Sequence, residues 1–130
     1  MSAFVKIPDG KDHAGEEAVY RFTIYYYEGK SMRTKLPVDV AYTGIAAAQV
    51  DICRAYYFSY TEPLTNCYFD SSTNMVSFDM PDSTNEGYFT YELGNLKNPS
   101  YSQMLSGFLI QTMDANGTAL YQSNEFMVQV

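Results

Sequence analysis

Between residues 86 and 123, apolar and polar residues alternate with a period of two on either side of a loop. This is the period of a β-strand with one buried face. The positions on the expected buried face are Phe89, Tyr91, Leu93, Phe108, Ile110 and Thr112. The loop at 95–103 is rich in Asn and Ser, which compete with the hydrogen bonds of a strand. Asp114 to Gly117 then predicts a type I′ turn, because Asn and Gly tolerate positive φ, so the segment predicts two or three antiparallel strands.

Shorter alternating runs occupy the rest of the chain. They predict strands at 3–7, 18–27, 36–42, 67–69, 75–80 and 126–130. The residues on the expected core face of the long second strand are Ala18, Tyr20, Phe22, Ile24 and Tyr26. Pro37 suggests an edge position for the third strand, because Pro cannot donate a ladder hydrogen bond. A polar, Gly-containing connection at 8–17 separates the first strand from the others.

Residues 44–60 fit two structures. Thr43 is a possible helix N-cap, and the positions that then have helical spacing are Ile45, Ala48, Ile52 and Tyr56. In a strand, the shared face would carry Val50, Ile52, Tyr56, Phe58 and Tyr60. The β-rich surroundings favour a strand from about 49 to 58, with the helix left open as an alternative.

About eight to ten short strands separated by turn signals are typical of a β-sandwich. We therefore expect an all-β, antiparallel, immunoglobulin-like sandwich that forms a single domain over residues 1–130. Its core should bring together residues of strands distant in sequence, namely Phe22, Ile24, Val76, Phe78, Phe108 and Ile110.

The composition and charge of the chain argue against some classes of binding partner. The formal net charge is −7, with 13 Tyr, 8 Phe and no Trp. An acidic chain without a basic face argues against nucleic acid and against an anionic membrane surface. The only cationic cluster, Lys30, Arg33 and Lys35, is interpreted as a solvated hairpin end. The sequence contains no run of 18 apolar residues, so it predicts no transmembrane helix. The first ten residues do not have the pattern of a signal peptide.

The run L-x-N-L-K-N-P-S, followed by S-G-F-L-I-Q-T-M-D-A-N-G, resembles the end of a β-sandwich module found in extracellular and surface proteins of ciliates and other protists. The strands around Cys67 and at 75–80 stand in similar places, and the resemblance covers roughly residues 64–123. It implies an extracellular or cell-surface location as part of a longer chain. No catalytic activity comes with it.

Cys53 and Cys67 are not in a metal-type spacing. In an oxidising compartment they would be natural disulfide partners across two neighbouring strands, and the extracellular interpretation favours that bond. The alternative is a pair of buried, reduced thiols.

Little else in the sequence indicates chemistry. His13 is the only His and lies in the polar connection, so a His-based catalytic or metal site has little support. A weak Ca²⁺ candidate consists of Asp79, Asp82, Asn85 and Glu86, although it lacks EF-hand spacing. Asn116 begins an Asn-Gly-Thr sequon and is a weak glycosylation candidate. We expect no enzyme activity and no cofactor.

The exposed tyrosines are the remaining candidates. Tyr25, Tyr27, Tyr88 and Tyr121 could form an aromatic platform for a sugar or a protein, or could only stabilise the sheet. The favoured hypothesis is a non-enzymatic structural or adhesive module whose partners are other protein domains, including copies of itself. A carbohydrate-binding module is the alternative. A further hypothesis is filament formation, in which the strand at 3–7 is donated to a neighbouring molecule.

Overall fold

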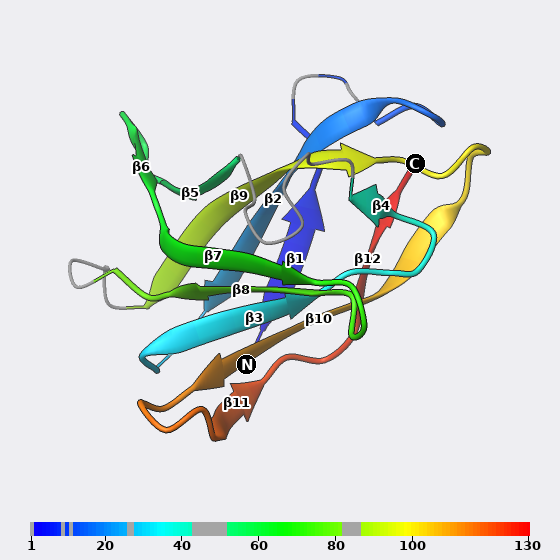
Figure 1. The fold of residues 1–130 in the computed structure, drawn as a ribbon. Coiled ribbons are helices and arrows are strands. Elements are labelled where there is room, and N and C mark those ends of the chain that lie inside the picture. Colours follow the sequence, from blue (N-terminus) through cyan, green and yellow to red (C-terminus); the bar gives the residue numbers. More distant parts are fainter. Residues whose placement is uncertain (1, 9, 11, 26–27, 43–51, 82–86) are drawn as a thin grey trace.

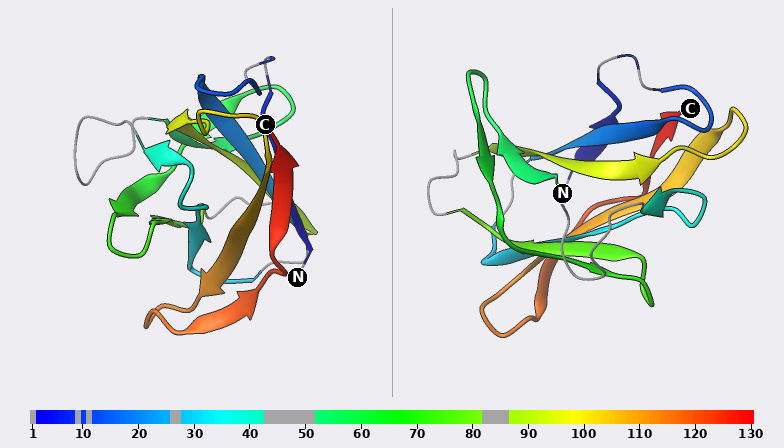
Figure 2. Two further views of the ribbon diagram at one scale, coloured as in Figure 1. Left: turned by 90° about the vertical axis from the view of Figure 1, so that its right-hand side faces the viewer. Right: turned by 45° about the horizontal axis from the view of Figure 1, so that its top comes forward.

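The computed structural model describes residues 2–8, 10, 12–25, 28–42, 52–81 and 87–130, and it contains strands but no helix within these residues. No helix in the described part of the chain could therefore cross a membrane. Two antiparallel sheets pack against each other (Figures 1 and 2). This confirms the all-β, antiparallel sandwich, while its immunoglobulin-like character stays a prediction.

The first sheet has the order β1-β2-β9-β5-β6, with β4 also paired to β9. Its strands are β1 (Ala3–Lys6), β2 (Glu17–Tyr25), β4 (Ala41–Tyr42), β5 (Cys53–Tyr56), β6 (Thr61–Pro63) and β9 (Tyr88–Lys97). The strand expected at 3–7 thus folds back onto its own sheet, with Ala3 opposite Ile24 and Lys6 opposite Arg21.

The second sheet has the order β11-β10-β3-β8-β7, with β12 also paired to β10. Its strands are β3 (Ser31–Lys35), β7 (Thr65–Asp70), β8 (Met75–Asp79), β10 (Met104–Met113), β11 (Ala119–Gln122) and β12 (Phe126–Gln129).

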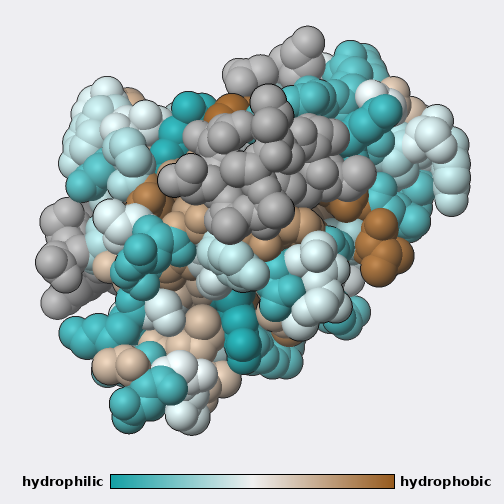
Figure 3. All heavy atoms as spheres, viewed as in Figure 1, coloured by the Kyte–Doolittle hydropathy of each residue, from teal (hydrophilic) through white to brown (hydrophobic). Residues whose placement is uncertain are grey.

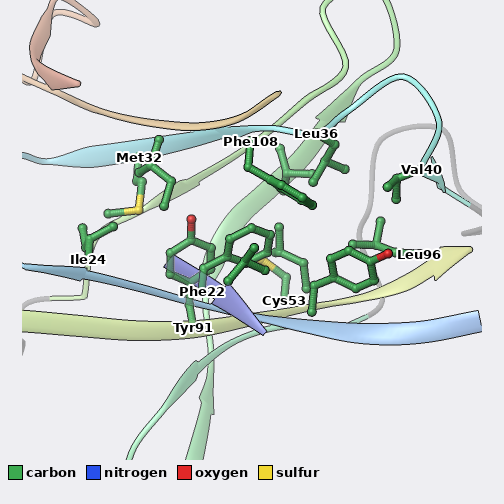
Figure 4. Close-up of a cluster of buried hydrophobic side chains, with 14 of the residues drawn as sticks. Phe22, Ile24, Met32, Leu36, Val40, Cys53, Tyr91, Leu96 and Phe108 are labelled. Carbon is green, nitrogen blue, oxygen red and sulfur yellow. The ribbon is translucent and has the colours of Figure 1, made fainter. Parts of the chain in front are cut away.

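The core lies between the two sheets, and all six residues predicted to meet there are buried in it. Phe22 of the first sheet and Phe108 of the second point toward each other, with their ring centroids 5.8 Å apart (Figure 4). The ring centroid of Tyr91 in the first sheet lies 4.9 Å from that of Phe78 in the second. The period-two pattern therefore identified the inward faces of β2, β8 and β10 correctly.

Of the strand expected at 36–42, only Ala41 and Tyr42 lie in a strand, the short β4, and the longer strand β3 precedes it at 31–35. Between them, Val40 N–H donates to Pro37 O (3.1 Å) in a turn that leaves Val38 89% exposed. The turn is held by Asn74, whose side-chain amide donates to the carbonyl oxygens of Leu36 and Pro37. Because Leu36 and Val40 are both buried, this turn imitates the alternation of a strand.

Two other expectations need correction. In β5, Cys53 and Ala55 are the buried residues, so the inward face is the opposite of the one expected from Tyr56 and Phe58; residues 43–51 lie outside the described part. The loop expected at 95–103 begins only after β9 ends at Lys97. There the buried Asn98 side chain accepts from Tyr20 OH (2.5 Å) and donates to His13 O (2.8 Å).

The hairpin between β10 and β11 is present, but its turn is not of type I′. Gly117 N–H donates to Asp114 O (3.1 Å), and Gly117 has a positive φ of 81°. Asn116 is not among the described residues with positive φ, as a type I′ turn requires. Asp114 N–H also donates to Thr118 O (2.9 Å), so this is a type I turn followed by a bulge residue, Gly117. A separate register shift lies further along the hairpin, between Thr112 and Met113.

Cys53 and Cys67 form a disulfide, with their Cα atoms 6.5 Å apart. The predicted pairing is therefore present, but its position differs. Cys53 lies in β5 of the first sheet and Cys67 in β7 of the second, so the bond joins the two sheets rather than neighbouring strands of one sheet.

Two tyrosine hydroxyls in the core predict a loss of stability in alkaline solution. Burial raises the pKa of Tyr20 and of Tyr91 well above the usual value. Above about pH 10 the unfolded chain releases these protons while the folded chain retains them, so stability is fully present below that pH and falls as pH rises. We expect melting temperature to decrease between pH 10 and 12, with a shallower decrease in Tyr91→Phe.

At neutral pH the Tyr91→Phe variant should be less stable than the parent, because the substitution removes the hydrogen bond between the Tyr91 hydroxyl and Thr34 Oγ1. The difference in stability between parent and variant should therefore narrow above pH 10. Thermal melts over this range measure it, and parallel curves for the two proteins would contradict the prediction.

Candidate functional site

A groove of about 350 Å³ lies on the outer face of the first sheet. We call it the outer groove; its lining includes Phe4, Lys6, Arg21, Thr23, Tyr88 and Thr90. It crosses strands β1, β2, β9 and β5. Its volume is at the lower end of the range for small-molecule sites.

Two short side chains form the floor. Thr23 on β2 stands directly opposite Thr90 on β9, and their Oγ1 atoms are 3.0 Å apart, within hydrogen-bonding distance. Thr23 is also opposite Phe4 on β1. A row of small residues between larger neighbours leaves a depression on an otherwise continuous sheet face.

Aromatic rings gather at one end of the groove, where Phe4 and Tyr88 line it and Tyr25 lies beside them. Tyr25 is opposite Tyr88 in the sheet, and their ring centroids are 6.2 Å apart. Phe4 extends this line, 6.1 Å from Tyr25. All three rings are partly exposed to solvent, so their faces and edges are available for contact.

Two cations, Lys6 and Arg21, line the other end of the groove, and Arg21 is held there by Glu92, which is not part of the lining. Glu92 is buried and accepts from two arginines: Arg21 Nε (3.1 Å) and Arg54 Nε (2.8 Å). The Arg21 guanidinium also lies over the Tyr56 ring, 3.9 Å from its centroid. Lys6 is opposite Arg21 on the neighbouring strand. Cross-strand pairing therefore places two arginines on one carboxylate, with Lys6 on the strand beyond Arg21.

The β5–β6 hairpin bounds the groove on a third side and projects from the body of the sandwich (Figure 1). Tyr57 N–H donates to Tyr60 O, and the centroids of the two rings are 4.7 Å apart. Phe58, at the tip between them, is fully exposed.

The structure brings together only part of the predicted tyrosine platform. Tyr25 and Tyr88 are neighbours on the first sheet. Tyr121 lies on β11 of the second sheet, where its hydroxyl approaches Glu28 Oε2 (3.4 Å), so including it in the platform was wrong. Tyr27 lies outside the described residues.

Phe4, Lys6 and Arg21 were missed as groove residues. The alternation in 3–7 and 18–27 already indicated that they point outward, but nothing in the sequence paired β1, β2 and β9 side by side. The register of the sheet places these residues in the same groove.

Only one of the four residues of the weak Ca²⁺ candidate, Asp79, lies in the described part of the chain. Asp79 accepts from Asn66 Nδ2 (2.5 Å), and Asp82, Asn85 and Glu86 lie outside the described residues. Among the residues that the structure describes, no group of three or more His, Cys, Asp or Glu side chains could hold a metal ion. Asn116 is exposed in the turn, where a glycan could be attached, and His13 is exposed in the polar connection.

A second groove, of about 360 Å³, lies on the outer face of the second sheet. Its lining includes Arg33, Tyr68, Asp70 and Asp79, so carboxylates and a cation are mixed there. Arg33 Nε donates to Gln111 Oε1 (2.6 Å). On the face shown in Figure 3, hydrophobic residues form small, separated areas among hydrophilic ones.

No family model and no curated protein matches the sequence. Among solved structures, the fold is similar to that of BslA, a bacterial hydrophobin, with a TM-score of 0.59 and 13% identity over 99% of this chain and 92% of that one. It is also similar to domains D2 and D3 of the major pilin SpaD from Corynebacterium diphtheriae, with a TM-score of 0.51 and 8% identity. That match covers 98% of this chain and 52% of the pilin chain, so this chain spans about half its length. At these identities the likeness establishes a shared β-sandwich fold.

Proposed function

We propose that the chain is a non-enzymatic structural or adhesive module of an extracellular or cell-surface protein. Its partners are other protein domains, including copies of itself. The observation that carries this proposal is the disulfide between Cys53 and Cys67, which connects the two sheets. Disulfides persist in oxidising compartments and are rare in the cytosol, so an inter-sheet disulfide supports an extracellular location.

The fold comparisons support the same proposal. A hydrophobin and a major pilin share the sandwich architecture with this chain. A fold can host many functions, so the likeness adds weight only together with the disulfide.

Assembly by strand exchange is the finer form of the proposal. β1 is an edge strand of the first sheet and pairs only with β2 within that sheet. In an exchanged assembly, β1 of one copy takes the same place on β2 of the next, with Phe4 opposite Thr23 as in the isolated fold. Pairing of this kind that does not close on itself produces a filament.

The test combines light scattering with cysteine cross-linking in a Phe4→Cys, Thr23→Cys variant. If strands are exchanged, the mass should increase with protein concentration, and a disulfide between the two new cysteines should join separate chains into a ladder. A cross-link confined within single chains, in a protein that stays monomeric, would reject strand exchange. Purified native protein with two freely alkylatable thiols at Cys53 and Cys67 would reject the extracellular proposal.

A carbohydrate-binding module is the second candidate function. The observation that favours it is the outer groove, which combines the exposed rings of Phe4 and Tyr88, with Tyr25 beside them, and hydrogen-bonding groups. Tyr offers a large contact area and a polar tip at a low entropy cost, which suits contact with sugar rings.

A further inference from the structure

We propose that the outer groove binds an acidic saccharide, that is, a sugar chain bearing carboxylate or sulfate groups. Sugar rings lie against Phe4 and Tyr88, and an acidic group faces Arg21 and Lys6. This inference rests on the second candidate function and specifies its ligand class.

The charge around the groove is opposite to that of the whole chain. The protein carries a net charge of −7, yet Lys6 and Arg21 both line the groove, and the neighbouring Glu92 carboxylate is paired with Arg21 and Arg54. None of the described residues that line the groove is acidic. Positive charge concentrated in one groove of an acidic protein attracts an anionic ligand to that place rather than to the surface in general.

Arg21 is held in position while part of its guanidinium stays available. Glu92 Oε2 contacts Nε (3.1 Å) and Nη2 (3.0 Å), and the Tyr56 ring packs against the guanidinium carbon. Nη1 forms no hydrogen bond with a described residue. A fixed planar donor group suits a carboxylate or sulfate, because little side-chain entropy is lost on binding.

Lys6 supplies a second cation that forms no ion pair with any described residue. Its position opposite Arg21, across one strand spacing, allows one acidic group to contact both side chains. Lys and Arg differ in geometry, so Lys6 adds a mobile point charge beside the fixed guanidinium.

The groove has room for a chain of sugar rings between its two ends. Tyr88 and Glu92 are four residues apart on β9, which separates the aromatic and cationic ends by about 13 Å. Thr23 and Thr90 form the low floor between these ends, and each has a hydroxyl that can exchange hydrogen bonds with a sugar. The spacing favours an extended saccharide over a single small anion.

Isothermal titration calorimetry tests the inference with a trimer of α-1,4-linked galacturonic acid and the same trimer with its carboxyl groups methyl-esterified. The acid should bind at least about tenfold more tightly than the ester, because a charge-assisted contact to Arg21 and Lys6 is lost in the ester. Lys6→Ala should weaken binding of the acid by about threefold to tenfold and leave binding of the ester unchanged. Tyr88→Ala should weaken binding of both by about tenfold.

Two matched variants serve as controls. Lys35→Ala removes an exposed lysine from β3 of the second sheet, and Tyr121→Ala removes a ring 45% exposed, against 50% for Tyr88. Both should bind the acid as the parent does. All four substituted residues are exposed, so their melting temperatures should stay close to that of the parent.

A heparin-derived tetrasaccharide serves as a sulfated probe. Binding of either acidic probe more tightly than the methyl ester supports the inference, and the tighter of the two shows whether the groove prefers a carboxylate or a sulfate. Equal binding of the acid and the ester would overturn the acidic class but retain a carbohydrate module. A lack of binding by every saccharide at millimolar concentration would overturn both, while the extracellular proposal is decided separately by the thiol assay. Equally tight binding of hexaglutamate would replace the saccharide with an acidic peptide and overturn the inference.

Discussion

Replacing Phe108 with Ala is expected to lower the free energy of unfolding by about 3–5 kcal/mol. Phe108 is fully buried in β10 and contacts aromatic rings from both sheets, with centroid distances of 5.8 Å to Phe22, 6.0 Å to Tyr20 and 5.6 Å to Phe126. Truncation removes this buried apolar area and leaves a cavity that rigid neighbouring strands cannot fill completely.

Phe58→Ala is the matched control. It makes the same chemical change at the exposed tip of the β5–β6 hairpin, and a surface change of this kind should alter stability by no more than about 0.5 kcal/mol. Urea unfolding of the three proteins measures both effects. If Phe108→Ala unfolds at nearly the same urea concentration as the parent, the packing between the sheets is not as described.

Removing the disulfide is expected to lower stability by about 3 kcal/mol. The bond closes a loop with a sequence separation of 14 and restricts the unfolded chain, so its loss makes the unfolded state more favourable. The variant Cys53→Ala, Cys67→Ala should therefore melt below the oxidised parent. Ala replaces two small residues without adding charge, and the double substitution removes the side-chain cross-link between the two sheets.

Reduction of the parent provides the control. With a reducing agent present, the parent should melt near the double variant, and the variant should not respond to the agent. Mass spectrometry of the oxidised parent should show a mass lower by two hydrogens than that of the reduced chain. A parent whose stability does not change on full reduction would contradict the prediction.

The separation of roles between the two faces of the first sheet explains why these predictions are independent of the groove test. In β2, Phe22 points into the core, while Arg21 and Thr23 on either side of it point outward. Strand geometry alternates side chains between the two faces, so a core variant and a groove variant act on different surfaces of the same strand. Stability and binding can therefore be measured separately.

Hydrophobic periodicity alone predicted the inward faces of the longest strands. Phe22 and Ile24, like Phe108 and Ile110, alternate with more exposed neighbours, and a one-residue change of register would expose all of them. The pattern was misleading where polar residues are buried with a partner. Thr34 is fully buried in β3, where its hydroxyl forms a hydrogen bond with the Tyr91 hydroxyl across the core. Because a polar residue occupies this inward position, the hydrophobic pattern did not predict β3, whereas the turn at 36–40 had the alternation of a strand.

The candidate site could be predicted only in part. The outward positions of Tyr25 and Tyr88 follow from the sequence, and so does the possibility of a bond between Cys53 and Cys67. The tertiary structure alone decided that this bond joins two sheets, that Tyr121 lies apart from the other tyrosines, and that Phe4 and Arg21 meet Tyr88 in one groove. The physical reason is that local alternation determines which face a side chain occupies, whereas its neighbours on that face depend on the pairing of strands far apart in the chain.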